Sequence, residues 1–252
     1  KLERKELAPA PEADPVTLIR RLHFDLIGLP PTPERTQNFL NAKDYETAWT
    51  DLVDELLASP QFGERLAIYW LDLVRYADTV GYHGDQDHNI SPYRDYVIRA
   101  FNQNLSFDTF TREQLAGDLI EDSGKWQKVA SGYNRLLQTS HEGGIQEKEY
   151  NTIYAADRVR NLSAVWMGAT VGCAQCHDHK YDPYTIKDHY ALAAFFADVH
   201  DVGYNGNALP TNRPPEMLFH SDANEEKLRD IKEDLESLLS PQQIMQLREF
   251  EK

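Results

Sequence analysis

Two cysteines and a histidine lie in one short segment, and their types and spacing could do chemistry. The segment VGCAQCHDHKYDP, residues 171–183, contains Cys173, Cys176 and His177. These are the only two cysteines of the 252-residue sequence, so there is no framework of structural disulfides. We therefore interpret the two thiols as groups for ligation or redox chemistry.

The order Cys-x-x-Cys-His is typical of covalent haem attachment. In this pattern both thiols join the haem vinyl groups, and the imidazole that follows binds the iron. We expect one haem c, held by Cys173 and Cys176, with His177 as the proximal iron ligand. Four further residues near in sequence are candidates for the haem surroundings: Trp166, His179, Lys180 and Arg158.

Three other interpretations of the segment stay open. Zinc could bind Cys173, Cys176, His177 and His179, although four ligands within seven residues reach tetrahedral positions with difficulty. In a variant of this interpretation, His189 or His200 completes the zinc site. A thioredoxin-like dithiol normally follows a β-strand, which this sequence does not predict here. The last of the three is a pair of buried, reduced cysteines that bind no ligand.

The second axial position of a haem iron has several candidates. An open or water-bound position would favour reactivity over simple electron transfer. His141, in the turn-like sequence HEGG, is the first distal candidate. The full set of side chains considered is His141, Met167, His179, His200, Met217 and His220.

The charge balance narrows the possible partners. The sequence has 26 Lys and Arg against 41 Asp and Glu, a net charge of -15. Such a surface repels phosphate, which disfavours nucleic acid and anionic membranes and suits a protein partner with a basic patch. No apolar run is long enough to cross a bilayer, and the charged, Pro-rich start has no apolar signal region, which indicates a mature or excised piece.

Helix signals dominate the sequence, which predicts a mainly α fold. A capping residue followed by proline recurs at Asp14, Thr32, Ser59, Ser91 and Ser240. Apolar periodicity predicts helices at about 15–27, 33–41, 45–58, 60–77, 92–103, 107–120, 148–171 and 186–198. The Cys/His segment then lies between the last two.

Composition also predicts the domain organisation. Residues 1–13 read as a linker or N-terminal extension, 14–204 as the c-type haem domain, and 205–252 as a loop and helical appendage that starts a following region. Within the appendage, Leu228, Ile231, Leu235 and Leu238 form a narrow apolar seam. This seam fits a helical hairpin, with a coiled-coil dimer as the alternative.

Several motifs in a fixed order give the sequence a family resemblance. They are LIRRLHFDLIGLPPTPE (18–34), ERLAIYWLDLVRYADTVGY (64–82), YRDYVIRAFNQN (93–104), REQLAGDLI (112–120) and GCAQCHDHKYDP (172–183). Together they resemble the planctomycete-type cytochrome c family, whose domains were long catalogued without a known function. Tyr69 stands where that family usually has His, and His141 where it usually has an acidic or amide residue.

The resemblance implies a covalent haem on Cys173, Cys176 and His177, export to the periplasm or cell exterior, and further domains in a larger parent chain. It also suggests a role in polysaccharide or sugar catabolism by association. Our leading hypothesis is a single-haem electron-transfer domain. The alternatives are a haem-dependent oxidoreductase acting on carbohydrate, with an open iron site, and a carbohydrate-binding or structural module. Arg75, Tyr76 and Tyr93, with their neighbours, could line a cleft or form a supporting ion-pair network.

Overall fold

Helices make up the regular structure of the chain. A computed structural model describes residues 2–81, 85–140, 146–199, 217–240 and 243. Across these ranges there are ten α-helices and four 3-10 helices, with one isolated bridge and no β-strand. This confirms the mainly α fold class. None of the helices in the described ranges has the length and apolar character that a bilayer crossing needs.

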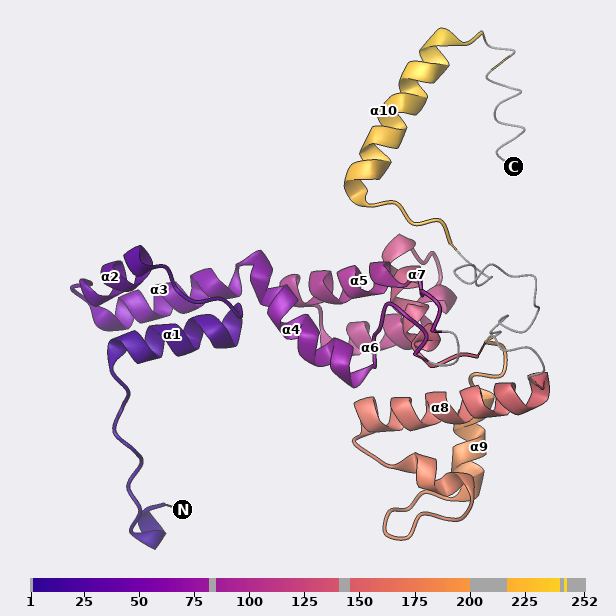
Figure 1. Ribbon diagram of the computed structural model, residues 1–252, viewed down its shortest axis with the longest axis horizontal. Coiled ribbons are helices and arrows are strands. Elements are labelled where there is room, and N and C mark those ends of the chain that lie inside the picture. The colour runs from indigo at the N-terminus through magenta and orange to yellow at the C-terminus, as the bar shows by residue number, and fades with distance from the viewer. Residues whose placement is uncertain (1, 82–84, 141–145, 200–216, 241–242, 244–252) are drawn as a thin grey trace. The chain divides into compact units, whose positions relative to one another are not determined.

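The first part of the chain contains these helices in order: η1 (Glu3–Lys5), α1 (Pro15–Leu26), α2 (Pro33–Leu40), α3 (Tyr45–Leu57), α4 (Pro60–Leu73), α5 (Ser91–Asn102), α6 (Phe107–Ala116), η2 (Gly117–Leu119), α7 (Lys125–Ala130) and η3 (Ser131–Arg135). It continues with α8 (Glu147–Met167), η4 (Val171–Gln175) and α9 (Ile186–Ala194), and the last helix is α10 (Asp222–Leu238) (Figure 1).

Local signals set most helix starts. The side chains of Asp14 and Thr32 accept hydrogen bonds from the backbone N–H three residues on, at 3.0 and 3.1 Å, with proline at the first helical position. The expectation for Ser91 was wrong by one residue, because Ile90 is the N-cap and Ser91 begins α5. Helix α4 ends at Leu73, earlier than expected, and Arg75 just beyond it is left-handed, with φ of 61°.

The chain divides into two compact units, Lys1–Pro214 and Pro215–Lys252. The second unit contains α10, none of whose residues is buried. Its predicted apolar seam, Leu228, Ile231, Leu235 and Leu238, is exposed. The second helix of the predicted hairpin lies almost wholly outside the described residues, as do His141 and His200.

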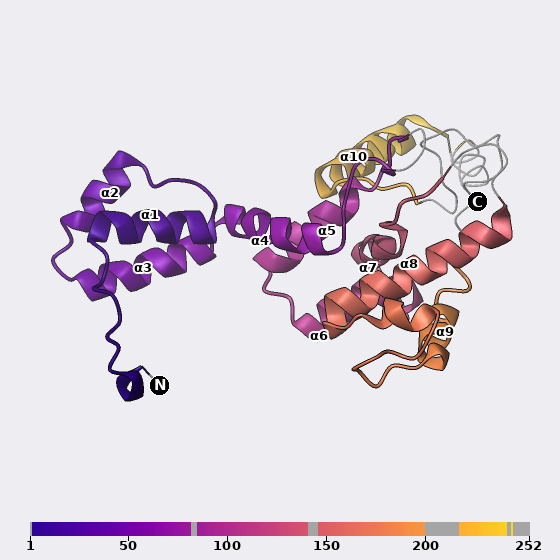
Figure 2. The same ribbon diagram turned by 60° about the horizontal axis from the view of Figure 1, so that its bottom comes forward.

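Helices α1, α2 and α3 pack around a small core of their own (Figure 2). Its buried residues are Ile19, Phe39, Leu52 and Leu56. His23 on α1 is also buried, and neither of its ring nitrogens has a hydrogen-bond partner among the described residues. Burial lowers the pKa of His23 because it disfavours the charged imidazolium. The cation of Arg35 adds to this effect, whereas Glu55 opposes it.

A second core joins α4, α5 and α6 through a buried polar network. Trp70 Nε1 donates to Gln114 Oε1 at 2.9 Å, and the Tyr93 hydroxyl donates to the same oxygen. The amide of Gln114 in turn donates to the Phe110 carbonyl at 3.1 Å. Because each polar atom of this network has a partner, Trp70, Tyr93 and Gln114 are buried together without the cost of an unpaired group. The Trp70 ring also contacts that of Trp166 on α8, with centroids 5.4 Å apart.

The buried His23 predicts a pH-dependent stability. The unfolded chain takes up a proton near the ordinary histidine pKa of about 6.5, whereas the folded protein resists it. Stability should therefore fall as pH drops below about 6.5, by at most about 1.4 kcal/mol per pH unit from this residue. Urea unfolding of the parent and His23→Leu at about pH 7 and about pH 5 measures this contribution, and the variant should lose less stability. Equal losses in the two proteins would contradict the prediction.

Candidate functional site

The short helix η4 presents the two thiols at the surface. In a 3-10 helix residues three apart lie on the same side. Val171 and Ala174 form one such pair and are completely buried. Cys173 within η4 and Cys176 directly after it are both exposed free thiols, followed by an exposed His177. The segment is therefore anchored by its apolar residues and exposes its chemically competent ones.

Helices α8 and α9 hold η4 in place. Val171 belongs to a buried cluster with Val159 and Ala169, against which Tyr184, Leu192 and Ala193 pack. The buried His189 of α9 donates through Nδ1 to the Val171 carbonyl at 3.3 Å, since a carbonyl can only accept. Figure 1 shows α9 packed against α8 next to the loop that carries the cysteines.

A glycine ends α8 and directs the chain toward η4. Gly168 has φ of +57°, the left-handed conformation that glycine adopts without steric cost. The backbone N–H groups of Gly168 and Ala169 both donate to the Ser163 carbonyl. Helix α8 therefore ends at Met167, and residues 168–170 separate it from η4, whereas the sequence predicted a helix that continues to residue 171.

The ring of His177 is oriented for ligation. Its Nδ1 lies 2.8 Å from the backbone carbonyl of Asp178. Because the carbonyl can only accept, Nδ1 carries the proton, and Nε2 keeps the lone pair that a metal would bind. Metal-binding histidines usually donate their other ring nitrogen in this way.

His179 braces the loop that follows. Its Nδ1 accepts from the backbone N–H of Asp182 at 2.8 Å and of Tyr181 at 3.3 Å. Nε2 must then carry the proton, which it donates to Thr170 Oγ1 at 2.9 Å. Both nitrogens are thus used within the protein, which opposes a role as iron or zinc ligand.

Further bonds stiffen the same loop behind His177. The Asp178 carboxylate accepts from Ile186 N at 2.9 Å, at the start of α9, and His179 N donates to the Tyr184 carbonyl at 2.7 Å. Lys180 lies over the Tyr181 ring at 5.1 Å. The carbonyl that orients His177 therefore belongs to a loop fixed at both ends.

The other two residues considered as haem surroundings have contacts in the core. Trp166 packs on Trp70 and Tyr133, and its Nε1 donates to Thr111 at 3.1 Å. Arg158 is buried and donates through Nε to the Asn134 carbonyl at 3.0 Å.

Arg160 is the arginine whose side chain reaches the cysteine segment. It donates from Nη1 to Gln175 Oε1 at 3.1 Å, and its stem lies on Gly172, where a Cβ atom would come within 2.5 Å of the Arg160 Cγ. Arg160 was not among the residues that the sequence pattern indicated. The glycine before Cys173 was the available signal that another group approaches closely.

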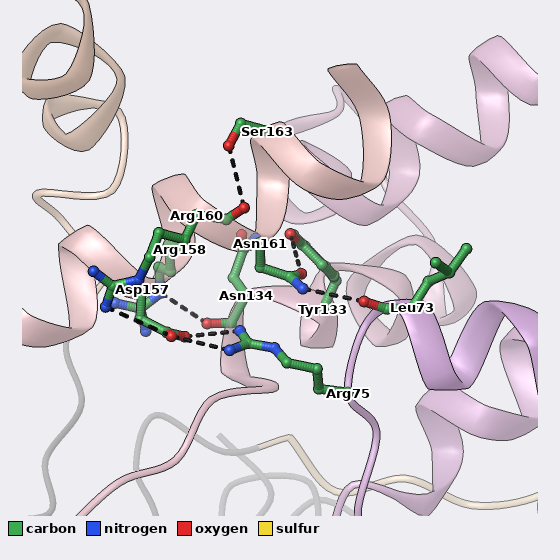
Figure 3. Close-up of polar contacts among 9 residues, drawn as sticks. All are labelled: Leu73, Arg75, Tyr133, Asn134, Asp157, Arg158, Arg160, Asn161 and Ser163. Carbon is green, nitrogen blue, oxygen red and sulfur yellow. Dashed lines mark hydrogen bonds and ion pairs between the residues drawn. The ribbon is translucent and has the colours of Figure 1, made fainter. Parts of the chain in front are cut away.

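The residues proposed to line a cleft mostly form supporting contacts. Arg75 makes a bidentate pair with Asp157 of α8, at 2.9 and 2.7 Å (Figure 3). Tyr76 donates to Asp78 at 2.7 Å, and burial together with this bond raises the pKa of Tyr76. Tyr93 is part of the buried network described above. These contacts favour the interpretation as a supporting network.

A zinc site receives little support from the described residues. Nowhere in the described ranges do three or more His, Cys, Asp or Glu side chains gather as metal ligands. His179 uses both ring nitrogens internally, and His189 is buried with Nδ1 on a carbonyl. His200 lies outside the described residues.

Of the candidates for the distal iron ligand, Met167 is partly exposed in the last turn of α8, and Met217 and His220 belong to the second unit.

Three exposed apolar side chains lie on α9 or directly after it: Ile186, Tyr190 and Phe195. Tyr190 also donates to the Gln175 carbonyl at 3.2 Å, which places this side chain beside η4.

These features define an all-α domain that displays a Cys-x-x-Cys-His segment on its surface. The chain belongs to the PSCyt2 family, described as a protein of unknown function (DUF1549), whose family model matches residues 1–201. The match supports the family resemblance drawn from the motifs. Neither a curated protein nor a solved structure matches the chain.

The bracing role of His179 predicts distinct effects of three substitutions. His179→Leu removes the hydrogen bonds of the imidazole and should cost about 1–3 kcal/mol while speeding amide exchange at residues 181 and 182. His179→Asn keeps an acceptor near the position of Nδ1 and should preserve most of that protection. His179→Gln places its amide nearer Thr170 and should preserve less.

Amide hydrogen exchange across residues 177–186 provides the measurement. A fourth variant, Lys180→Gln, changes a neighbouring exposed side chain and serves as the control. Unchanged exchange at residues 181 and 182 in His179→Leu would rule out the brace.

Proposed function

We propose that this chain is an exported single-haem c-type cytochrome domain that transfers electrons. The observation that carries the proposal is the joint presentation of Cys173, Cys176 and His177 on one exposed turn, with His177 Nε2 left for ligation. The donor set fits the group, because it offers two accessible thiols for the vinyl carbons and a neutral imidazole for iron.

The residues around the turn support the same assignment. The exposed side chains of Ile186, whose backbone N–H donates to Asp178, and Tyr190, beside Gln175, offer apolar surface that a porphyrin would cover, and such burial is favourable in water. The Asp178 carbonyl would hold the His177 ring in one orientation. Bound there, the group would supply a one-electron iron couple.

Exposure of the attachment site suits electron transfer to another protein. Because the thiols lie at the surface, the attached group would remain accessible to a partner. With a net charge of -15, the chain would attract a partner that has a basic patch. Covalent attachment by a c-type maturation system would place the domain in the periplasm or outside the cell. A role in sugar catabolism would then concern the partner or the parent chain.

Attachment can be tested by removing the thiols. Expressed with a c-type maturation system, the parent should give a covalent pyridine haemochrome, and the double variant Cys173→Ala, Cys176→Ala should give none. Both side chains are exposed, so the free energy of unfolding of the unliganded double variant should stay within about 0.5 kcal/mol of that of the unliganded parent. A parent protein without covalent haem would refute the proposal.

The variant His177→Ala distinguishes covalent attachment of the haem from ligation of its iron. This variant should keep both thioether bonds and lose the proximal nitrogen, so its haemochrome should persist while the absorption spectrum of the untreated protein changes. The control Tyr181→Phe alters an exposed neighbour and should leave both spectra unchanged. An unaltered spectrum of His177→Ala would assign the proximal position to another residue.

Addition of cyanide and carbon monoxide to the parent distinguishes electron transfer from the oxidoreductase alternative. Iron with two strong protein ligands should ignore both additives, as expected for electron transfer. Iron that binds either additive readily, together with oxidation of a sugar or polyol by the protein, would contradict our proposal and support the haem-dependent oxidoreductase.

A further inference from the structure

Arg160 contacts the cysteine segment, and its positive charge is compensated only in part by a neighbouring carboxylate. Its stem lies on Gly172 and its Nη1 donates to Gln175, so it contacts η4 on both sides of Cys173. About half of its side chain is exposed. The guanidinium is therefore held at the edge of the segment and is still reachable from solvent.

Among the residues that the structure describes, the charge of Arg160 is only partly compensated. Within the described part of the chain its carboxylate partner is Asp157, yet Nη2 lies 3.9 Å from Asp157 Oδ1, too far for a hydrogen bond. Both oxygens of Asp157 are already occupied by the bidentate pair with Arg75. Figure 3 shows Asp157 between the two arginines. Two guanidinium groups thus share one carboxylate.

This arrangement suits a second carboxylate. A guanidinium presents several N–H donors in a planar fork that matches carboxylate geometry, and Arg160 uses Nη1 on a neutral amide. A ligand that bonds to Cys173 and carries its own carboxylates would approach this arginine.

We propose that Arg160 binds a propionate carboxylate of the haem attached to Cys173 and Cys176. The inference rests on the proposed function and adds an anion-binding residue to that site. A nearby guanidinium favours the ionised carboxylate and disfavours positive charge on the iron. It therefore lowers the pKa of the propionate and raises the reduction potential of the haem.

The test measures haem content and reduction potential separately in the full chain. Arg160→Gln keeps a stem as far as Cδ over Gly172 and removes the charge, whereas Arg160→Lys keeps the charge and loses the fork. The control Arg112→Gln removes an exposed arginine of α6 that pairs with Asp108 at 2.8 Å. Each protein is titrated between dithionite and ferricyanide over a range of pH.

All four proteins should carry covalent haem. In Arg160→Gln the potential should fall, and the pH at which the potential begins to change should rise by about one unit or more. Arg160→Lys should show a smaller shift in both quantities, and Arg112→Gln none.

Haem-loaded Arg160→Gln with the potential and pH dependence of the parent would overturn the assignment while leaving the proposed function intact. Equal shifts in Arg160→Gln and Arg112→Gln would also overturn it, because they would reflect net charge alone. A parent without covalent haem would instead overturn the proposed function, and this inference with it.

Discussion

Burial of α8 from two sides is the constraint on which the site depends. On one side Val159 packs with Val171 of η4 and with residues of α9. On the other side Asn161 accepts from the Tyr133 hydroxyl at 2.8 Å and donates to the Leu73 carbonyl at 3.2 Å. Because buried polar groups need partners, this second contact fixes the rotation of α8 as firmly as its apolar side does. The position of η4 follows from that rotation.

The sequence predicted the helices well where local signals dominate. Proline after a capping residue marked the start of α1, α2 and α4, and the Cys-x-x-Cys-His pattern located the candidate site. The face of α8 was harder to predict, because Arg158, Asn161 and Ser163 are buried beside apolar residues and blur the amphipathic pattern. For the same reason the sequence could not show that Arg160, two residues beyond Arg158, contacts Gly172 and Gln175 of η4.

Histidine roles were equally hidden in the sequence. His177 and His179 are two residues apart and could both be ligands by type. Their hydrogen bonds distinguish them, since His177 donates to one carbonyl while His179 accepts from two backbone N–H groups and donates to Thr170. Such differences depend on the path of the loop through residues 178–186. Family membership does not supply them either, because the family description assigns no function and chemistry must be argued from the site.

The anchoring of η4 also separates the residues that hold the segment from the residues that it exposes. Val171 and Ala174 complete their contacts inside the protein, while the neighbouring thiols face outward. The contacts that hold η4 in place therefore do not involve the two sulfur atoms. A substitution or modification at either sulfur would leave these anchoring contacts intact, so the exposed side of the segment can change chemically while its buried side keeps its position.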